Sequence, residues 1–469
     1  MGRLFGTDGV RGVAITELTP ELAMNIGKAV AFVISEKQRN PKICIGKDPR
    51  VSSDILECAL TAGMCSVGAD VISLGTVPTP AVAALTVEKG YSAGIMISAS
   101  HNSMEFNGIK IFSGLGYKLS DEMEDEIEHF VNNSEKIPLA AGGEVGRYSV
   151  MTDAANEYVN RIVRICMEEN GTEETDYLNF KTHAENAQSR KLRIAVDCAN
   201  GSAGVTAKKL FESLGAQCEI FNAETDGINI NSRCGSTDMT SLQETVKSGD
   251  FDAGIAFDGD ADRFLAVNEN GEIVDGDKIM AVCAKAYNDK GILKDSAVVV
   301  TVMTNIGFTY FAEENGIKVI TANVGDRYVL EKMLENGYNL GGEQSGHIIF
   351  LDDATTGDGQ LSAARFLRIL ATSGTKVSEL TGIMEHFPQV LVNVKIRPET
   401  KSAWKNDAGL KDIIEKYENE LSDGRILVRE SGTEPLIRVM LEGKNLKKIE
   451  EIANNVAGYI KEKFGSEDH

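Results

Sequence analysis

The sequence predicts an α/β protein with three related α/β domains, built on mixed, mostly parallel sheets, and a smaller C-terminal α+β domain. Strand-like apolar runs alternate with helix-like segments over most of the chain, which is typical of crossover units. A strand–helix–Gly–strand pattern also recurs three times. The 469 residues exceed what one hydrophobic core supports, so several domains are expected.

The N-terminal part shows the alternation most clearly. Residues 19–34, "TPELAMNIGKAVAFVI", predict a helix with Thr19 as its N-cap and Pro20 at the first helical position. "KICIG" (42–46) predicts a strand, and "SSDILECALTAGMCSVGA" (52–69) predicts the next helix. This order implies a parallel sheet with helical crossovers.

The recurring pattern consists of a helix that ends at a glycine and leads into a strand. It is present in "SVGADVISLG" (66–75), "SLGAQCEIFN" (213–222) and "ENGIKVITAN" (314–323). A further strand precedes each copy: "KICIG", "LRIAVD" and "AVVVTV". Any helix that ends in glycine before a strand has this appearance, so the repeat favours related domains without proving them.

After about residue 374 the pattern changes. Strands are expected in "PQVLVNVKI", "GRILVRE" and "PLIRVMLEG", with one helix over 404–421 and another at the C-terminus, which indicates an α+β domain. The polar stretch 168–191 is interpreted as an exposed excursion of the second domain. The predicted domains are residues 1–150, 151–253, 254–373 and 374–469.

The charge balance restricts the function. Acidic residues outnumber basic ones 70 to 48, which gives a formal net charge of −22. A surface this negative repels phosphate backbones and anionic lipids, so neither nucleic acid nor a membrane is an expected partner. A phosphate-bearing substrate would therefore need a locally positive pocket.

The sequence at the N-terminus and the spacing of the cysteines predict a cytoplasmic location. The start "MGRLFGTDGV" contains no apolar core of signal-peptide length, and no apolar run reaches the length of a membrane span. The eight cysteines include no Cys-x-x-Cys pair, which argues against a zinc site. We expect them to be reduced core residues.

The sharpest motif is "DGDADR", with aspartates at 258, 260 and 262. Extended backbone would place the three carboxylates on one side, and a bound cation would relieve their repulsion. A solvated acidic turn does not explain the apolar strands on both sides. A calcium-binding helix–loop–helix needs glycine at its sixth position, where Arg263 stands. The motif therefore predicts a divalent-metal loop, with Mg²⁺ favoured.

A second motif is "ISASHN" (97–102), where an apolar strand ends at Ser100 and His101. Ser and Asn open turns, so a structural turn is one interpretation. A nucleophilic serine is the other; it needs a base or a metal, and Mg²⁺ would also neutralise a phosphoryl group on the hydroxyl. Lys110 follows in "NGIK" (107–110).

Two further stretches combine glycines with polar groups. "GGEQSGH" (341–347) suits recognition of vicinal hydroxyls, although a glycine-rich turn explains it equally well. In "RESGTEPLIR" (429–438) two arginines flank hydroxyls and a glycine turn, which are groups that bind phosphate. A structural turn is the alternative there too.

Together with "FGTDGVRG" (5–12), these four stretches in this order resemble the α-D-phosphohexomutase superfamily. The resemblance extends from Phe5 to Gly443, and "GGEQSGH" and "TTGDG" (355–359) favour its glucosamine-phosphate branch. It implies a heart-shaped, four-domain protein around a central cleft, in which the first three domains share one α/β fold.

The resemblance also implies a role for each matched residue. Ser100 corresponds to the serine that is phosphorylated in the active enzyme, and its phosphate is the fourth Mg²⁺ ligand beside Asp258, Asp260 and Asp262. Glu343 and Ser345 correspond to readers of sugar hydroxyls. The remaining roles are general acid/base for Lys110 and His347, proximity to the phosphoserine for Arg11, His101 and Arg263, and a clamp on the non-reacting phosphate for Arg429, Ser431, Gly432, Thr433 and Arg438.

The implied activity is that of an isomerase, an intramolecular phosphotransferase that interconverts glucosamine 6-phosphate and glucosamine 1-phosphate for amino-sugar and cell-wall precursor supply. Phosphoserine and a 1,6-bisphosphate intermediate carry the reaction, and the bisphosphate also primes Ser100. The expected partner is a small sugar phosphate, with a homodimer as the candidate assembly. The sequence leaves open the oligomeric state, the first phosphorylation of Ser100 and the main general base.

Two alternatives stay open at this stage. A phosphomannomutase or phosphoglucomutase would use the same mechanism, and a divalent-cation-binding protein would use Ser100 only as a turn residue. One departure from the superfamily pattern concerns the serine loop: Ser103 stands where proline commonly follows Ser-His-Asn. Without proline the loop is expected to be less rigid.

Overall fold

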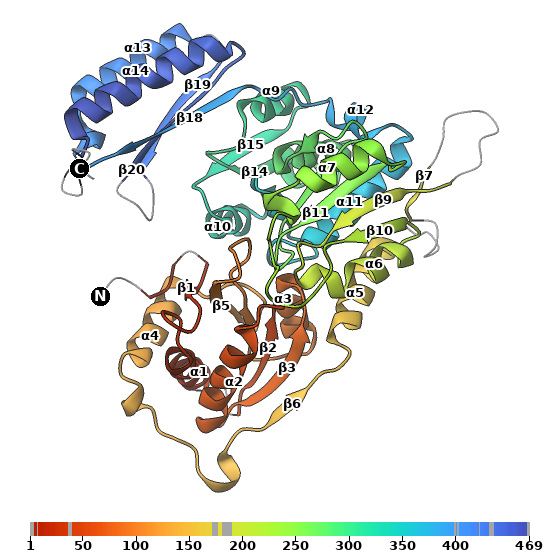
Figure 1. Ribbon diagram of the computed structural model, residues 1–469, viewed down its shortest axis with the longest axis vertical. Helices are drawn as coiled ribbons and strands as arrows, with labels where there is room; N and C mark the ends of the chain where they lie inside the picture. The colour runs from red at the N-terminus through yellow and green to blue at the C-terminus, as the bar shows by residue number, and fades with distance from the viewer. Residues whose placement is uncertain are drawn as a thin grey trace. The chain divides into compact units, whose positions relative to one another are not determined.

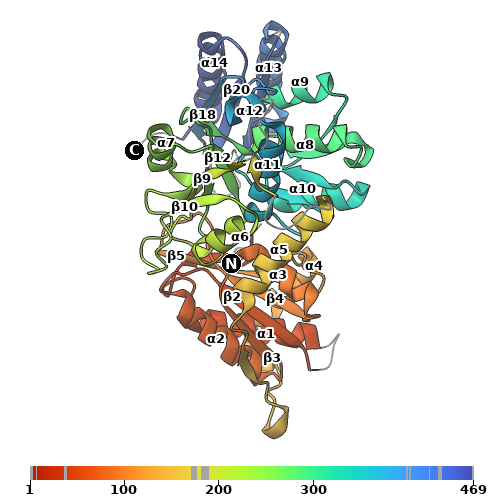
Figure 2. The same ribbon diagram turned by 90° about the vertical axis from the view of Figure 1, so that its right-hand side faces the viewer.

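The computed structural model describes residues 4–6, 8–35, 40–170, 177–180, 190–397, 400, 403–421, 423–430 and 436–466. The chain forms two compact units, which are coloured along the sequence in Figures 1 and 2. The first contains residues 1–303 and 316–383, and the second contains residues 304–315 and 384–469. No helix in the described ranges is long and apolar enough to cross a membrane.

The first sheet has six strands in the order β1-β5-β4-β2-β3-β6. β4, β2, β3 and β6 run parallel, whereas β5 and β1 are antiparallel to their neighbours. Buried aliphatic side chains of the strands and helices form its core. The elements are β1 (Val10–Val13), α1 (Pro20–Ser35), β2 (Lys42–Lys47), α2 (Ser53–Ser66), β3 (Asp70–Thr76), α3 (Thr79–Glu88), β4 (Ala93–Ile97), β5 (Phe106–Ser113), α4 (Asp121–Val131) and β6 (Tyr148–Val150).

The second sheet has five strands in the order β10-β9-β11-β12-β13. β10, β9 and β11 are parallel, and β12 and β13 return antiparallel. The elements are α5 (Ala154–Asn170), β9 (Arg193–Asp197), α6 (Ala207–Ser213), β10 (Gln217–Phe221), α7 (Thr240–Ser248), β11 (Ala253–Phe257), β12 (Phe264–Val267) and β13 (Ile273–Val274).

The third sheet has four strands in the order β15-β14-β16-β17, of which only β17 is antiparallel to its neighbour. Asp358 begins α11 by accepting a hydrogen bond from the Leu361 N–H, and Gly374 ends it in the left-handed conformation. The elements are α8 (Gly276–Asp289), β14 (Ala297–Thr301), β15 (Lys318–Ala322), α10 (Asp326–Asn336), β16 (Leu340–Gly342), β17 (Ile348–Phe350), α11 (Gly359–Ser373) and α12 (Val377–Thr381).

The predicted repeat is confirmed by the strand pairing. β2 pairs with β3, β9 with β10 and β14 with β15, all in parallel, and each pair is joined by a helix. The glycine between helix and second strand has a positive φ in all three copies: +98° at Gly68, +95° at Gly215 and +66° at Gly316. A residue without Cβ adopts this conformation most readily, which explains why glycine ends each helix.

The same repeat places three of the sequence motifs at equivalent positions. In each α/β sheet, one parallel strand is followed directly in sequence by an antiparallel neighbour: β4 by β5, β11 by β12 and β16 by β17. The connecting segments are 98–105, 258–263 and 343–347. They carry Ser100, the three aspartates and "EQSGH", respectively.

The second unit contains a three-stranded antiparallel sheet in the order β18-β20-β19, with its own hydrophobic core. Glu442 is buried in it and accepts hydrogen bonds from Arg425 at 2.6 Å and from the Ile306 N–H at 3.2 Å. Its elements are α9 (Ile306–Glu314), β18 (Gln389–Lys395), α13 (Ala408–Glu420), β19 (Arg425–Glu430), β20 (Leu436–Glu442) and α14 (Leu446–Phe464).

The smaller elements complete the described fold. The helix expected over 404–421 is divided, because Asp407 caps the start of α13 after a short 3₁₀-helix. Within the predicted excursion 168–191, residues 168–170, 177–180 and 190–191 are described, and the others lie outside the described residues. The expectation of an exposed stretch is wrong for Tyr177 and Leu178, which are buried. These elements are η1 (Ser134–Lys136), η2 (Gly142–Glu144), β7 (Asn179–Phe180), β8 (Arg190–Lys191), η4 (Ser202–Val205), η5 (Gly235–Thr237), η6 (Lys294–Ser296) and η8 (Trp404–Asn406).

All eight cysteines are free, in agreement with the expectation of reduced thiols. The expectation that all are core residues is wrong for three of them. Cys58 is exposed, and Cys65 and Cys218 are partly exposed.

Candidate active site

Ser100 follows β4 in a left-handed backbone conformation, with φ +53°. Its side chain is buried, and Oγ donates a hydrogen bond to Oδ2 of Asp258 at 2.6 Å. The metal loop passes so close that a Cβ at Gly259 would lie 2.6 Å from the Ser100 carbonyl oxygen. The left-handed backbone at Ser100 and the absence of a side chain at Gly259 allow the Ser100 hydroxyl to contact the carboxylate of Asp258, 158 residues away.

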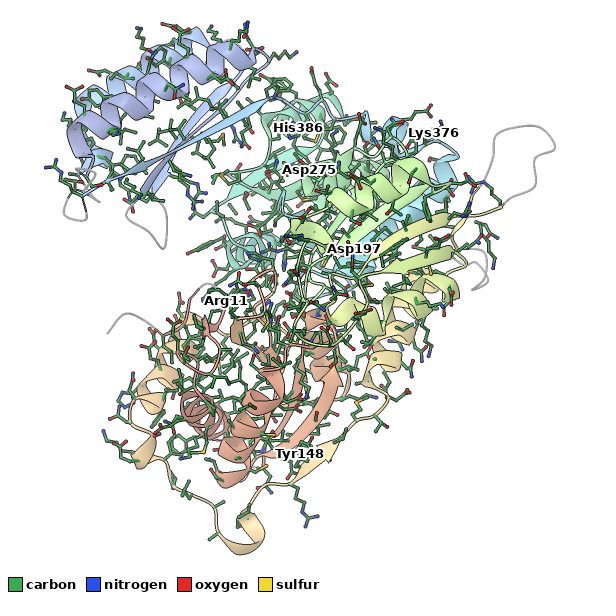
Figure 3. All side chains as sticks on the ribbon, viewed as in Figure 1. Arg11, Tyr148, Asp197, Asp275, Lys376 and His386 are labelled. Atoms are coloured by element: carbon green, nitrogen blue, oxygen red, sulfur yellow. The ribbon has the colours of Figure 1, made fainter. Side chains whose placement is uncertain are left out.

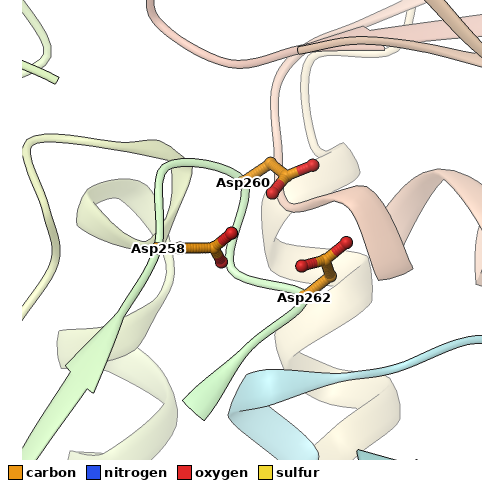
Figure 4. A group of neighbouring side chains, drawn as sticks. All are labelled: Asp258, Asp260 and Asp262. Carbon is orange, nitrogen blue, oxygen red and sulfur yellow. The ribbon is translucent and has the colours of Figure 1, made fainter. Parts of the chain in front are cut away.

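The three aspartates converge on one point, as Figure 4 shows. Carboxylate oxygens of Asp258, Asp260 and Asp262 all lie within 4.8 Å of one another, and the three residues are buried. The backbone there is a turn with Ala261 at φ +57°, so the expected extended backbone is wrong although the convergence is right.

The electrostatics of this triad fit a cation. Burial, followed by repulsion from Asp262 and Asp260, raises the pKa of Asp258 to about 8. Oδ1 of Asp260 and Oδ1 of Asp262 are buried without a hydrogen-bond partner. Hard oxygen ligands that repel one another and have unused lone pairs match the requirements of a divalent ion. The triad can therefore hold a metal.

Lys110 reaches this triad from β5. Its buried Nζ lies 2.8 Å from Oδ2 of Asp260, 3.2 Å from Oδ2 of Asp262 and 3.2 Å from Oδ2 of Asp8. Burial alone would lower the pKa of Lys110, but the carboxylates raise it well above its usual value. Lys110 is therefore a cation in this arrangement.

His101 and two arginines surround Ser100. The Nδ1 atom of His101 lies 3.4 Å from Ser100 Oγ. Burial, and then the positive charges of Arg263 and Arg11, lower the pKa of His101 to about 4, so the ring is neutral at pH 7. The Nε atoms of both arginines are buried without a partner. Figure 3 labels Arg11 on the N-terminal part of the first domain. Each arginine therefore keeps one buried N–H without a hydrogen bond, although Arg11 also pairs with Asp8 and Arg263 Nε lies 3.9 Å from Asp262 Oδ1.

The turn between β16 and β17 presents Glu343, Ser345 and His347. Glu343 Oε1 accepts a hydrogen bond from the Gly325 N–H at 3.0 Å, and Ser345 Oγ is buried without a partner. The Gly357 N–H donates to His347 Nε2 at 3.1 Å, and Nδ1 lies 3.8 Å from Asp262. Burial would lower the pKa of His347, but Asp262 and two further carboxylates raise it.

The predicted phosphate clamp lies in the second unit. Arg429 in β19 stands directly opposite Arg438 in β20. Burial, and then the charge of Arg438, lower the pKa of Arg429, and Arg438 Nε is buried without a hydrogen-bond partner. Two opposed guanidinium groups repel each other, so an anion between them would stabilise this pair. Ser431, Gly432 and Thr433 lie outside the described residues.

Sequence reasoning missed a buried ion-pair chain beside the site. Lys118 Nζ lies 2.6 Å from Asp8 Oδ1 and 2.6 Å from Asp326 Oδ2. Asp8 also pairs with Arg11, and Asp326 Oδ2 lies 3.5 Å from His347 Nε2. Asp8 stands in "FGTDGVRG", but Lys118 and Asp326 belong to no quoted motif. Only their neighbours in space reveal them.

Comparison with known families matches nearly the whole chain. The models described as phosphoglucomutase/phosphomannomutase alpha/beta/alpha domains I, II and III match residues 2–138, 175–271 and 275–387. The C-terminal domain of the same family matches residues 391–458. The chain belongs to the phosphoglucomutase/phosphomannomutase family. The predicted superfamily membership and fold class are confirmed, and so is the expectation of a mutase of this type.

Individual relatives are similar over their full length. A phosphoglucosamine mutase of Caldanaerobacter subterraneus is 49% identical and covers 99% of this chain and 100% of its own. A phosphoglucosamine mutase of Ruminiclostridium cellulolyticum is 50% identical, with 95% and 96% covered. Among solved structures, a phosphoglucomutase/phosphomannomutase family protein of Burkholderia thailandensis has a TM-score of 0.77 at 23% identity, covering 98% of this chain and 97% of its own.

Another solved structure is the N-acetylphosphoglucosamine mutase of Aspergillus fumigatus in complex with GlcNAc-6P and magnesium. It covers 98% of this chain and 95% of the fungal chain, with a TM-score of 0.68 at 18% identity. At this identity the likeness concerns the fold.

Proposed function

We propose that this enzyme interconverts glucosamine 6-phosphate and glucosamine 1-phosphate, with Ser100 as the carrier of the phosphoryl group. The observation that carries the proposal is the contact of Ser100 Oγ with Asp258 inside the buried triad, at 2.6 Å. The full-length similarity to phosphoglucosamine mutases supports the choice of sugar. We also propose a cytoplasmic location and a homodimer, as predicted from the sequence.

The reaction consists of two phosphoryl transfers. In the first, O1 of glucosamine 6-phosphate attacks the phosphorus of phosphoserine 100; the new O1–P bond forms while the P–Oγ bond breaks. The sugar hydroxyl loses its proton to a base, and a 1,6-bisphosphate results. After the bisphosphate reorients, Ser100 Oγ loses its proton to a base and attacks the 6-phosphoryl group. The new P–Oγ bond forms while the P–O6 bond breaks, O6 takes up a proton, and glucosamine 1-phosphate leaves with Ser100 phosphorylated again.

Each ionisable side chain around Ser100 has a separate role in the proposed reaction. Arg11 and Arg263 offer their free donors to the phosphoryl oxygens. Lys110, held as a cation by the carboxylates, stabilises negative charge on the phosphoryl group; its raised pKa keeps the proton on Nζ. His101, whose pKa of about 4 leaves it neutral, is positioned to accept a proton beside Oγ. His347 keeps the orientation of Asp262.

The metal in this proposal is Mg²⁺, for which all-oxygen ligands of this kind are typical. Asp258, Asp260, Asp262 and Ser100 are the residues that would hold it. When bound, it neutralises charge on the phosphoryl oxygens. If Asp258 bound the metal, it would no longer accept the hydrogen bond from Ser100 Oγ, and the hydroxyl would be available for phosphorylation.

A phosphorus NMR time course tests the proposed function. The assay combines the protein, Mg²⁺, glucosamine 6-phosphate and catalytic glucosamine 1,6-bisphosphate, and we expect the signal of glucosamine 1-phosphate to grow to equilibrium. Parallel samples with mannose and glucose 6-phosphates test the sister activities. Faster turnover of either hexose phosphate would replace the proposed substrate. No turnover of any of the three would overturn the proposal.

Chelation separates the enzyme from a protein that merely binds a cation. EDTA is expected to abolish turnover while lowering Tm by less than about 4 °C. The physical reason is Lys110, which keeps Asp260 and Asp262 paired without an ion. Activity assays and thermal melts on one sample check this. A large loss of Tm, with added Mg²⁺ restoring the fold, would favour a structural cation site.

The clamp gives a prediction about substrate binding. If Arg438 and Arg429 hold the phosphate that is not reacting, Arg438→Ala removes a charge-assisted contact worth about 1.5–3 kcal/mol, so KM should rise roughly 10- to 100-fold. Free 1,6-bisphosphate should also accumulate, because the intermediate escapes before it reorients. Steady-state kinetics and phosphorus NMR measure both effects.

The matched control is Arg397→Ala. Arg397 lies in the same unit, and its one side-chain hydrogen bond within the described ranges is donated to the Lys463 carbonyl oxygen. We expect this variant to keep the wild-type KM. A normal KM and no released bisphosphate in Arg438→Ala would mean that the stretch is only a turn.

A further inference from the structure

We infer that Arg50, together with Asn231, is a positioning residue that holds the serine loop (residues 100–106) in the conformation that directs Ser100 Oγ toward Asp258. The kinetic test of this inference rests on the proposed function, whereas its test by amide exchange does not. Arg50 belongs to no motif that carried the sequence analysis, although it follows the predicted strand "KICIG" closely.

Every N–H of the Arg50 guanidinium group has an acceptor. Nη2 donates to the carbonyl oxygens of Ser100 at 3.0 Å and Asn102 at 2.8 Å. Nη1 donates to the carbonyl oxygens of Phe106 at 3.1 Å and Ser103. One planar group thus binds four backbone carbonyls of a seven-residue loop, which a lysine with its compact ammonium group cannot imitate.

Asp48 fixes the fifth donor and balances the charge. Both side chains of the Arg50–Asp48 pair are fully buried, and Nε lies 2.9 Å from Asp48 Oδ2. Asp48 also accepts a hydrogen bond from Ser98 Oγ at 2.6 Å, and the same Oγ accepts from the Ser100 N–H at 2.9 Å. The loop is therefore held at its carbonyls and at the serine amide.

Asn231 holds the loop from the second domain. Its Nδ2 donates to the Ser100 carbonyl oxygen at 2.8 Å and to the Asn102 carbonyl oxygen at 2.9 Å. These two carbonyls each receive one bond from Arg50 and one from Asn231. Asn231 adopts the left-handed backbone conformation, with φ +56°. Such a conformation persists only where the surrounding structure holds it.

The loop needs such support for two reasons. Ser100 has φ +53°, a left-handed conformation that is unfavourable for a residue with a Cβ. Position 103 is a serine, so no proline ring restricts the backbone there. The hydrogen bonds of Arg50 to residues 102, 103 and 106 supply the missing restriction.

Arg50 acts only through the backbone, and this sets the expected kinetic result. Within the described residues, the side-chain hydrogen bonds of Arg50 all go to loop carbonyls and Asp48, so removing them misplaces Ser100 Oγ without altering the groups that bind the sugar. A misplacement of about 1 Å can lower a rate about 100-fold. We expect Arg50→Lys to lower kcat roughly 10- to 100-fold while KM changes by less than about twofold.

The control is Arg365→Lys. Arg365 is another buried arginine; it pairs with Asp353 and lies over the Phe350 ring, away from the serine loop. It should lose Tm as Arg50→Lys does but keep kcat. Backbone amide exchange of residues 98–106, which needs no substrate, should accelerate in Arg50→Lys and stay unchanged in Arg365→Lys.

Asn231→Ala provides a second route that does not disturb the buried ion pair. It should lower kcat at constant KM and accelerate exchange in the same segment, even where Arg50→Lys fails to fold. Wild-type kcat and wild-type exchange in either variant would overturn the inference. Accelerated exchange without any wild-type turnover would instead contradict the proposed function and leave the positioning role intact.

Discussion

Ser100→Ala is expected to reduce turnover to the assay background, a loss of at least about 10⁴-fold. The reason is chemical: in the proposed reaction both transfers pass through Ser100 Oγ, which donates a hydrogen bond to Asp258. The Thr79 hydroxyl also contacts the triad, at Asp260, but the proposal gives it no part in carrying the phosphoryl group. The wild-type protein should carry one phosphoryl group on Ser100 in a fraction of molecules, and the Ala variant should carry none. Intact-mass spectra before and after treatment with the bisphosphate measure this.

The fold should survive this change, because the hydroxyl contributes one hydrogen bond and the backbone contacts of the loop do not depend on it. Ser103→Ala is the matched control, since Ser103 is exposed in the same loop. It should retain phosphorylation and turnover. An active Ser100→Ala variant, or wild-type protein that never accepts phosphate from the bisphosphate, would rule out the carrier role.

Asp260→Asn is expected to have the second largest effect. A carboxamide keeps the shape of the side chain but removes the negative charge that a divalent cation requires. The change also removes one of the three carboxylates that pair with Lys110, whose Nζ lies 2.8 Å from Asp260 Oδ2. We expect kcat to fall by roughly 10²- to 10³-fold at saturating substrate, and the Mg²⁺ concentration for half-maximal activity to rise.

Thermal melts separate this effect from unfolding. Asp260 accepts hydrogen bonds from Thr79 Oγ1 at 2.5 Å and from Lys110, and the amide oxygen of asparagine can still accept one of them. We therefore expect only a small fall in Tm. Asp250→Asn is the control that should keep full activity, because the Asp250 side chain is exposed and pairs with Arg193. Wild-type activity of Asp260→Asn at low Mg²⁺ would refute the metal assignment.

Local pattern predicted most of the fold. The three strand–helix–Gly–strand units were visible because a helix end and a buried strand each have short-range signatures: a left-handed glycine at Gly68 or Gly215, and an unbroken apolar run in "AVVVTV". The division of the helix at Asp407 was not predicted, because capping depends on which of several neighbouring polar residues the packed chain selects.

The candidate site could be predicted only where its functional residues stand close together in the sequence. Asp258, Asp260 and Asp262 stand within five positions, so their shared chemistry was visible before the turn at Ala261 was known. Lys118 and Asp326 stand 208 positions apart, and Arg50 and Ser100 stand 50 apart. No local signal connects such partners.

The sequence by itself determined the fold class, the family and the chemical identity of the reacting groups. The apolar pattern predicted the fold class because it shows which side chains each segment buries. The short polar motifs predicted the family by resemblance, and they named the functional groups. Only the tertiary structure decided how these groups are charged and held: Lys110 is a cation because three carboxylates surround it, and His101 is neutral because burial and two arginines oppose its protonation. Protonation and orientation depend on the distances between atoms from separate strands, and those distances exist only once the sheets have packed.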